Sequence, residues 1–212
     1  MTNEEYFEIL PTKIEELLKL RDTGKKYAAG IIGQTLLKED FFFSASTNRC
    51  MNLIDGFIYM LQKRNLTCAG ALLRLQLDNC MRTYAAFIAE DKEKVIDCII
   101  SGERIDKQKS KDGKSLKDGY LKDELSKLDP GFSIVYDNTS GYIHLSDKAF
   151  YQTVKSCDNE VIEWVIGTTL LERFNPLLIE SADAFVHFVQ LHYQILSAVV
   201  KSKERVDREY QD

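Results

Sequence analysis

Two arginines and an aspartate recur at helical spacing in the middle of the chain. Arg74, Asp78 and Arg82 follow one another in steps of four residues, which places them on one face of a helix. The residues around them are apolar on nearly every other side, so we expect this helix to be central. Charges on a central helix must be paired or must face a wet pocket, because unpaired burial is costly.

Two interpretations of these three side chains remain open. In the first, the two arginines and Asp78 form a ladder of ion pairs that only neutralises itself. In the second, Asp78 holds one guanidinium in place and the other guanidinium is free to bind an anion in a pocket. Because the residues around these charges are apolar, the pocket is a stronger candidate here than it would be on a surface helix.

The best candidate for general acid/base chemistry is His144. Imidazole exchanges a proton near neutral pH, and Ser140 and Tyr142 lie close to His144 in the sequence. A serine hydrolase built from Ser140, His144 and either Asp78 or Asp137 is kept only as a reserve alternative, because a chain of this length supplies such triples by chance.

Two other histidines fall in the last predicted helix. His187 lies on its polar side and is expected to be inert. His192 lies in its apolar stripe, and a lone histidine there is predicted to be a hydrogen-bonded core residue.

Hydrophobic periodicity predicts an all-α chain, an up-and-down helical bundle in one domain spanning residues 1–212. Gly24 is predicted to end the first helix, Ser44 to Thr47 to cap the third, and residues 137–141 to form a turn. The expected helices cover residues 3–20, 25–37, 48–64, 65–90, 92–100, 115–128, 132–136, 158–173 and 176–207.

Residues 101–114 are predicted to form a mobile basic loop, and residues 205–212 a frayed tail. From Arg104 to Lys117 the chain carries six basic side chains and two acidic ones. A solvated loop is favoured over a phosphate-binding segment. If the central helix does line a ligand pocket, we expect this loop to lie at its mouth.

The bulk composition limits the classes of function. With 33 acidic and 28 basic side chains the net charge is -5, which argues against a general binder of nucleic acids or membrane surfaces. Five widely spaced cysteines form no metal-binding pattern, so we expect neither a metal nor a cofactor. The sequence shows no secretory signal and no apolar run of roughly 20 residues, which predicts a cytoplasmic protein that does not enter membranes.

Several short motifs resemble a known group. The sequences LKDGYL at 116–121, VY at 135–136, SGYIHLS at 140–146 and LRLQLDN at 73–79, with Arg82, resemble uncharacterised bacterial all-α proteins similar to the HEPN superfamily. The resemblance spans roughly residues 45–150, and the segment from the tyrosine to the histidine is its most specific part.

The resemblance implies a commonly dimeric four-helix bundle, and many HEPN proteins are metal-independent ribonucleases in toxin–antitoxin and phage-defence systems. Active members carry an arginine, a short spacer and a histidine. Here the corresponding positions before His144 are Asp137, Asn138 and Thr139, none of them arginine. Asn138 could hydrogen-bond a phosphate, and Arg74 or Arg82 would have to supply the missing charge.

Two functional hypotheses follow. The first is a HEPN-like protein whose pocket, lined by Arg74, Asp78, Arg82 and His144, binds RNA or a nucleotide and could cleave it. Asn138, Ser140 and Tyr142 are the further residues predicted to bind the ligand. The second is a non-catalytic interaction or sensor module that forms a homodimer through the apolar stripe of the last helix.

Overall fold

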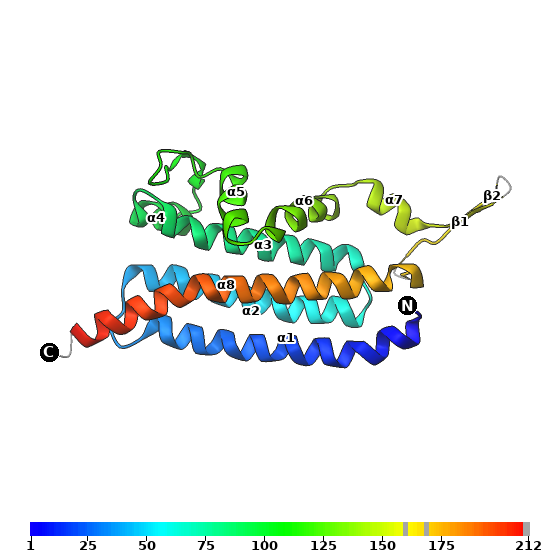
Figure 1. The fold of residues 1–212 in the computed structure, drawn as a ribbon, viewed down its shortest axis with the longest axis horizontal. Coiled ribbons are helices and arrows are strands. Elements are labelled where there is room, and N and C mark those ends of the chain that lie inside the picture. Colours follow the sequence, from blue (N-terminus) through cyan, green and yellow to red (C-terminus); the bar gives the residue numbers. More distant parts are fainter. Residues whose placement is uncertain (159–160, 168–169, 210–212) are drawn as a thin grey trace.

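Four long helices form the body of the protein. The computed structural model describes residues 1–158, 161–167 and 170–209. The long helices are α1 (Asn3–Ile32), α2 (Lys38–Gln62), α3 (Leu66–Ile88) and α8 (Asn175–Glu209). Each packs mainly against two of the others, in the cyclic order α1, α2, α3, α8, and α2 also contacts α8 (Figure 1). The prediction of an all-α fold is confirmed.

The last helix of the bundle, α8, runs parallel to α1. The Asn175 side chain donates to the carbonyl of Thr2 at 3.1 Å, and farther along the Tyr193 hydroxyl donates to the carbonyl of Leu20 at 2.9 Å. The predicted up-and-down order is therefore wrong at its last step. The chain between α3 and α8 returns to the starting end of the bundle before α8 begins (Figure 1).

This long crossover first forms a second layer on the outer side of α3 and then extends beyond the end of the bundle (Figure 1). Its elements are α4 (Lys92–Ile100), the 3₁₀ turn η1 (Ile105–Lys107), α5 (Asp118–Leu128), α6 (Gly131–Ile143), α7 (Asp147–Thr153), β1 (Val154–Asp158), β2 (Val161–Trp164) and the 3₁₀ turn η2 (Glu172–Phe174). Because α3 packs against both layers, Leu77, Cys80 and Met81 are fully buried. The expectation that this helix is central is confirmed.

The apolar stripe of α8 faces the interior of the chain. Phe188 is 1% exposed and Leu191 is 6% exposed. The Phe188 ring packs edge-on against Phe132 of α6 at 5.5 Å between centroids, and Phe185 stacks on Phe57 of α2 at 4.1 Å. The predicted dimer surface on the last helix is wrong, because these side chains already form the core.

Gly24 does not end a helix. It is buried inside the continuous helix α1, where a Cβ atom would lie 2.6 Å from the Tyr193 hydroxyl and 2.8 Å from Met51 Cγ. The glycine therefore permits close packing of α1 against α8 and α2. The helix ends instead at Gly33, whose φ of +54° suits glycine.

The second long helix begins ten residues earlier than predicted, at Lys38 rather than Asn48. Ser46 and Thr47 are buried within it and do not cap its start. The Thr47 hydroxyl donates to the Phe43 carbonyl one turn back at 2.8 Å, which satisfies it inside a helix.

The predicted turn at residues 137–141 is helical, within α6. Thr139 is buried there, and its hydroxyl donates to the carbonyl of Val135 at 2.7 Å. The small polar residues that favour a turn in isolation are held in a helix because α6 packs along α3.

The helix predicted at residues 158–173 is also wrong. Where the structure describes this segment, β1 and β2 form an antiparallel hairpin in which Val154 pairs with Trp164 and Cys157 with Ile162. The β-branched and aromatic residues suit strands. Gly167 follows with a φ of +118°, and residues 159–160 and 168–169 of the prediction lie outside the described residues.

The segment at residues 101–114 is folded against the protein. It contains η1, and isolated bridges pair Ala89 with Ser110 and Lys109 with Ser115. Ile105 and Ser110 are buried. Its backbone is therefore tied to the end of α3 and not only solvated.

The predicted frayed tail is helical up to Glu209, and residues 210–212 lie outside the described part of the chain. Lys203 is buried and pairs with the equally buried Asp40 at the start of α2. Asp207 accepts the backbone N–H groups of Gln34 at 2.9 Å and Thr35 at 3.0 Å. These contacts fix the end of α8 to the α1–α2 connection.

No helix among the described residues is long and apolar enough to cross a membrane.

Candidate anion-binding cleft

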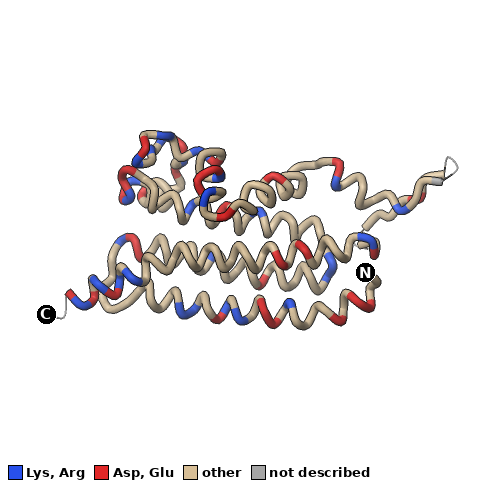
Figure 2. Tube along the Cα trace, viewed as in Figure 1, with Lys and Arg blue, Asp and Glu red and all other residues tan. Residues whose placement is uncertain are grey.

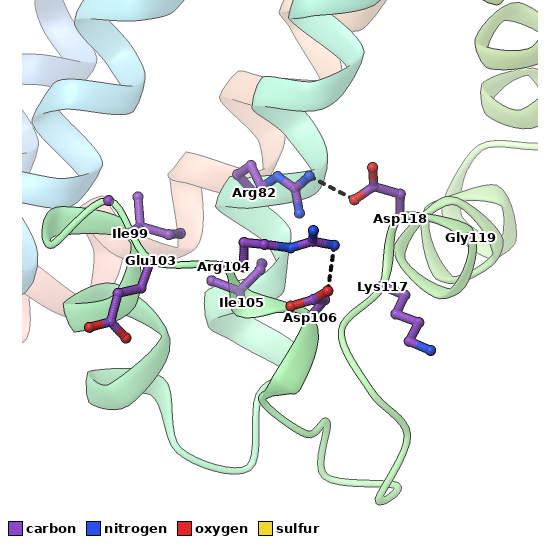
Figure 3. A pocket seen from close by; sticks show the side chains of 10 residues that line it. Arg82, Ile99, Glu103, Arg104, Ile105, Asp106, Lys117, Asp118 and Gly119 are labelled. Atoms are coloured by element: carbon purple, nitrogen blue, oxygen red, sulfur yellow. Dashed lines mark hydrogen bonds and ion pairs between the residues drawn. The ribbon is translucent and has the colours of Figure 1, made fainter.

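Arg82 lies in a cleft between α3, the segment after α4 and the start of α5 (Figure 3). The cleft has a volume of about 940 Å³, within the usual size range of small-molecule sites. The guanidinium of Arg82 lies between two carboxylates, with Nη2 at 2.6 Å from Asp118 and Nε at 3.3 Å from Asp78 of its own helix. Arg82 is thus held in position at the wall of the cleft.

A second arginine enters the same cleft from a distant part of the sequence. Arg104 directly precedes η1, and its Nη2 is 2.6 Å from Oδ2 of Asp106. Figure 3 shows its guanidinium extending beside that of Arg82 toward the start of α5. The charged ends of Glu103 and Lys117 point away from the two guanidinium groups in that view.

The start of α5 forms the third side of the cleft. Its first residue is Asp118, and no side chain caps the helix. The first backbone N–H groups of a helix have no intrahelical acceptor and favour an anion. A Cβ atom at Gly119 would meet nothing within 4 Å, so a ligand can approach the backbone there.

The charges that line the cleft are balanced. Arg82, Arg104 and Lys117 face three acidic residues, Glu103, Asp106 and Asp118. Each arginine is already engaged by a carboxylate, so the cleft as it stands is a set of ion pairs that an anion would have to enter. A dianionic phosphate could compete for both guanidinium groups, since guanidinium binds phosphate in the same forked geometry as carboxylate.

Arg74 does not reach this cleft. Its guanidinium lies flat over the ring of Tyr136 on α6, with Cζ 3.2 Å from the ring centroid. Its buried Nε has no hydrogen-bond partner among the described residues. Asp78 pairs with Arg82 and not with Arg74, so the three side chains do not form the predicted ladder. Arg74 packs on Tyr136, so it is not the free guanidinium of the second interpretation either.

A second, smaller cavity of about 280 Å³ contains two of the predicted ligand-binding residues, Asn138 and Tyr142. The Tyr142 ring packs directly on the backbone of Gly70, where a Cβ atom would be 2.4 Å away. Lys148 Nζ lies 4.6 Å from the centroid of this ring and donates to the Asn138 carbonyl. Burial, followed by the nearby Glu180 carboxylate, raises the pKa of Tyr142.

His144 lies at the exposed end of α6, where its backbone N–H bonds to the Ser140 carbonyl at 3.3 Å. The adjacent Tyr142 contacts Gly70, and at roughly 1.5 Å per residue Arg82 is about 18 Å farther along α3. The structure thus does not bring His144 and Arg82 into one pocket.

The reserve alternative of a serine triad is not assembled either. Asp137 pairs with Lys122 at 3.1 Å and Asp78 with Arg82 at 3.3 Å, so neither carboxylate is engaged with His144.

His192 is a fully buried core residue, as predicted. Its Nε2 lies 2.8 Å from the Ser46 hydroxyl and 3.3 Å from that of Thr83. Burial lowers its pKa to about 3, so it is neutral at physiological pH. His187, on the polar side of α8, pairs with Asp129.

The sequence did not identify Asp118 as a partner of Arg82, nor Arg104 as the second arginine of the cleft. The expectation that the basic segment borders the pocket is met for the Arg82 cleft, because Arg104 and Lys117 at its two ends line it. Only the bridges at the end of α3, which fold this segment back, bring the two arginines together.

No group of side chains able to hold a metal ion occurs in the described part of the chain. Comparison with protein-family models, with curated proteins and with solved structures finds no match for this chain. Its chemistry must therefore be inferred from its own side chains.

Proposed function

We propose that this chain is a HEPN-like helical protein that binds the phosphate group of a nucleotide or an RNA in the cleft of Arg82. The observation that carries the proposal is the convergence of Arg82 and Arg104 on the uncapped start of α5 around a cavity of about 940 Å³. Two forked guanidinium groups and a helix N-terminus are complementary to a phosphate dianion.

The carboxylates of the cleft are compatible with this proposal, because they occupy the guanidinium groups that a phosphate would bind. Asp118 holds Arg82 and Asp106 holds Arg104, both at 2.6 Å, so the arginines are already oriented and neutralised without a ligand. A phosphate that replaces one carboxylate would make the same hydrogen bonds with a greater charge. Binding would then be modest in affinity and selective for doubly charged groups.

The distribution of charge favours recognition of one phosphate group over tracking along a polymer. Basic and acidic residues are interspersed around α4, α5 and the segment that joins them (Figure 2). A protein that follows an extended nucleic acid needs a continuous basic groove. We therefore expect a nucleotide or an RNA end to bind better than an internal stretch of RNA.

The proposal concerns binding and does not include cleavage. No histidine is among the described residues that line the cleft, and His144 lies at the far end of α6. Assistance of 2′-OH attack by His144 would need a substrate that reaches it from a phosphate held about 18 Å away along α3.

The test is isothermal titration of the protein with inorganic phosphate, nucleoside mono- and triphosphates, and a short single-stranded RNA with or without a terminal phosphate. Arg82→Gln and Arg104→Gln should each weaken binding about tenfold or more, because each removes charge-assisted hydrogen bonds. The matched control is Arg21→Gln, because the guanidinium of Arg21 on α1 forms a similar ion pair with Asp55 on α2 at 2.8 Å.

Asp118→Asn separates ligand binding from structural damage. It frees Arg82 of a competing carboxylate, so affinity for phosphate should rise although an ion pair has been lost. His144→Ala should leave the affinity unchanged. Equal affinities for wild type, Arg82→Gln and Asp118→Asn would refute the cleft as the binding site. If the wild type cleaves RNA in the presence of EDTA and His144→Ala does not, the protein is also a nuclease and the restriction to binding is refuted.

A further inference from the structure

The segment after α6 carries a concentration of exposed apolar side chains. We call residues 145–158 and 161–166, which include α7, β1 and β2, the arm; it projects beyond the end of the helical bundle (Figure 1). Figure 2 shows charged residues of both signs along it. Seven large apolar side chains of the arm are 47% to 96% exposed: Leu145, Phe150, Tyr151, Val161, Ile162, Trp164 and Ile166.

Three of these side chains pack against one another. The Phe150 ring contacts the rings of Tyr151 and Trp164 edge-on, at 5.7 Å and 5.9 Å between centroids. All four residues of β2 are exposed, so no part of the body covers that strand. An isolated two-stranded hairpin is marginally stable in water, and it normally needs a further strand or a packed layer.

Of the two edges of the hairpin, the edge formed by β2 is the one open to pairing with another strand. Arg173, in η2, donates to the carbonyls of Tyr151, Val154 and Lys155, and thereby occupies the outer side of β1. The sheet of the described residues has two strands, so β2 has no neighbour on its other side. A free, apolar edge strand is a template for pairing with another chain.

The arm supplies enough apolar area for a stable dimer. Large side chains of this kind offer on the order of 100 Å² each at these exposures, which gives roughly 700 Å² for the seven. A standard specific interface buries about 800 Å² per partner. If all seven became buried, an interface of two arms would fall within the usual range of about 600–1,000 Å² per partner without any contribution from the bundle.

We infer that the arm is the surface through which two copies of this chain associate, with β2 of one copy pairing antiparallel to β2 of the other. Antiparallel pairing of one strand with its own copy is two-fold symmetric and closes at the dimer. Charge does not oppose it, because Lys155 and Glu163 neutralise each other across the hairpin at 2.9 Å.

The chain carries a built-in reporter for this interface. Trp164 is its only tryptophan, and it is 52% exposed on the arm. Sedimentation velocity and intrinsic fluorescence should be followed together over a dilution series of the full chain. The expected result is a mass of two chains at high concentration, with Trp164 emission shifting to longer wavelength as dilution releases one chain.

Ile162→Asp is the decisive variant, since it places a charge on β2 and leaves Trp164 in place. It should have the mass of one chain at every concentration, with unchanged helical circular dichroism. Leu36→Asp, at a 59% exposed position between α1 and α2, is the matched control and should remain dimeric.

If the wild-type protein has the mass of one chain at every concentration, the inference is overturned. The arm would then be a candidate surface for binding a different protein. A dimer that Ile162→Asp leaves intact, or whose dissociation does not change Trp164 emission, would equally overturn it, because association would then use another surface.

Discussion

The guanidinium of Arg74 lies 3.2 Å above the ring centroid of Tyr136, so a side chain that the sequence offers for anion binding is committed to the packing of α6 on α3. The buried Nε of Arg74 has no hydrogen-bond partner among the described residues. The ring face is therefore the main contact described for the guanidinium of this half-buried arginine.

Removing the ring while keeping an apolar side chain should be costly. We expect Tyr136→Leu to lower the free energy of unfolding by about 2 kcal/mol, the size of a desolvated cation–π contact. Urea denaturation measures this change. Tyr59→Leu is the control, because Lys63 lies 5.6 Å above an exposed ring there, and its loss should be about 0.5–1 kcal/mol. Equal losses for both variants would contradict the role assigned to Tyr136.

The buried His192 should make stability depend on pH. Burial lowers its folded-state pKa from 6.5 to about 3, so below pH 6.5 the unfolded chain binds a proton that the native protein does not. The stabilisation is complete above pH 6.5 and is lost as the pH falls toward 3, by up to about 1.4 kcal/mol per pH unit.

The measurement is the free energy of unfolding at pH 7 and at pH 5, for wild type and His192→Gln. Glutamine can retain a hydrogen bond to Ser46 but has no proton to gain. The variant should lose less stability than wild type between the two pH values, and an identical loss would show that His192 is not the group responsible.

The buried pair of Lys203 and Asp40 should fix the end of α8. We expect Lys203→Met to cost about 3–5 kcal/mol, because it leaves an uncompensated carboxylate in the interior. Adding Asp40→Leu should recover much of that loss, although the Leu37 N–H then loses its acceptor at 2.7 Å. Thermal and urea unfolding test both variants.

Lys201→Met, at an exposed position two residues away, is the control and should change stability by less than about 0.5 kcal/mol. A Lys203→Met variant as stable as this control would mean that α8 frays before residue 203.

Two helical glycines should respond oppositely to alanine. At Gly70 a Cβ atom would lie 2.4 Å from the Tyr142 ring, so Gly70→Ala should destabilise the protein by about 1–3 kcal/mol. At Gly56 the nearest atom, Leu72 Cδ1, is at an ordinary 3.4 Å, and Gly56→Ala should stabilise α2 by up to about 1 kcal/mol. Urea midpoints give both values, and a stabilising Gly70→Ala would show that Tyr142 does not pack there.

The sequence by itself determined the elements whose signals are local. Apolar periodicity predicts α3, and in the structure Asn65 caps this helix by accepting the Cys68 N–H at 3.0 Å. Periodicity also predicts α4, which Asp91 caps in the structure, and most of α8. It also places Arg74, Asp78 and Arg82 on one side of α3, and it identifies His192 as a core residue.

Tertiary packing decided the rest. The residues at 137–141 have turn propensity, but packing along α3 keeps them helical, and Gly24 serves the close approach of α8 and not a helix end. The site depends on three contacts that only the tertiary structure sets. Arg74 packs on the ring of Tyr136, and Arg82 pairs with both Asp78 and Asp118. The Tyr142 ring packs on the backbone of Gly70. Those pairings depend on where α5 and α6 dock along α3, and docking is a sum of long-range contacts that spacing within one segment does not encode. The residues predicted to share one pocket therefore lie in three places. Arg82 lines the cleft, Arg74 packs on Tyr136, and Asn138 and Tyr142 line a separate cavity.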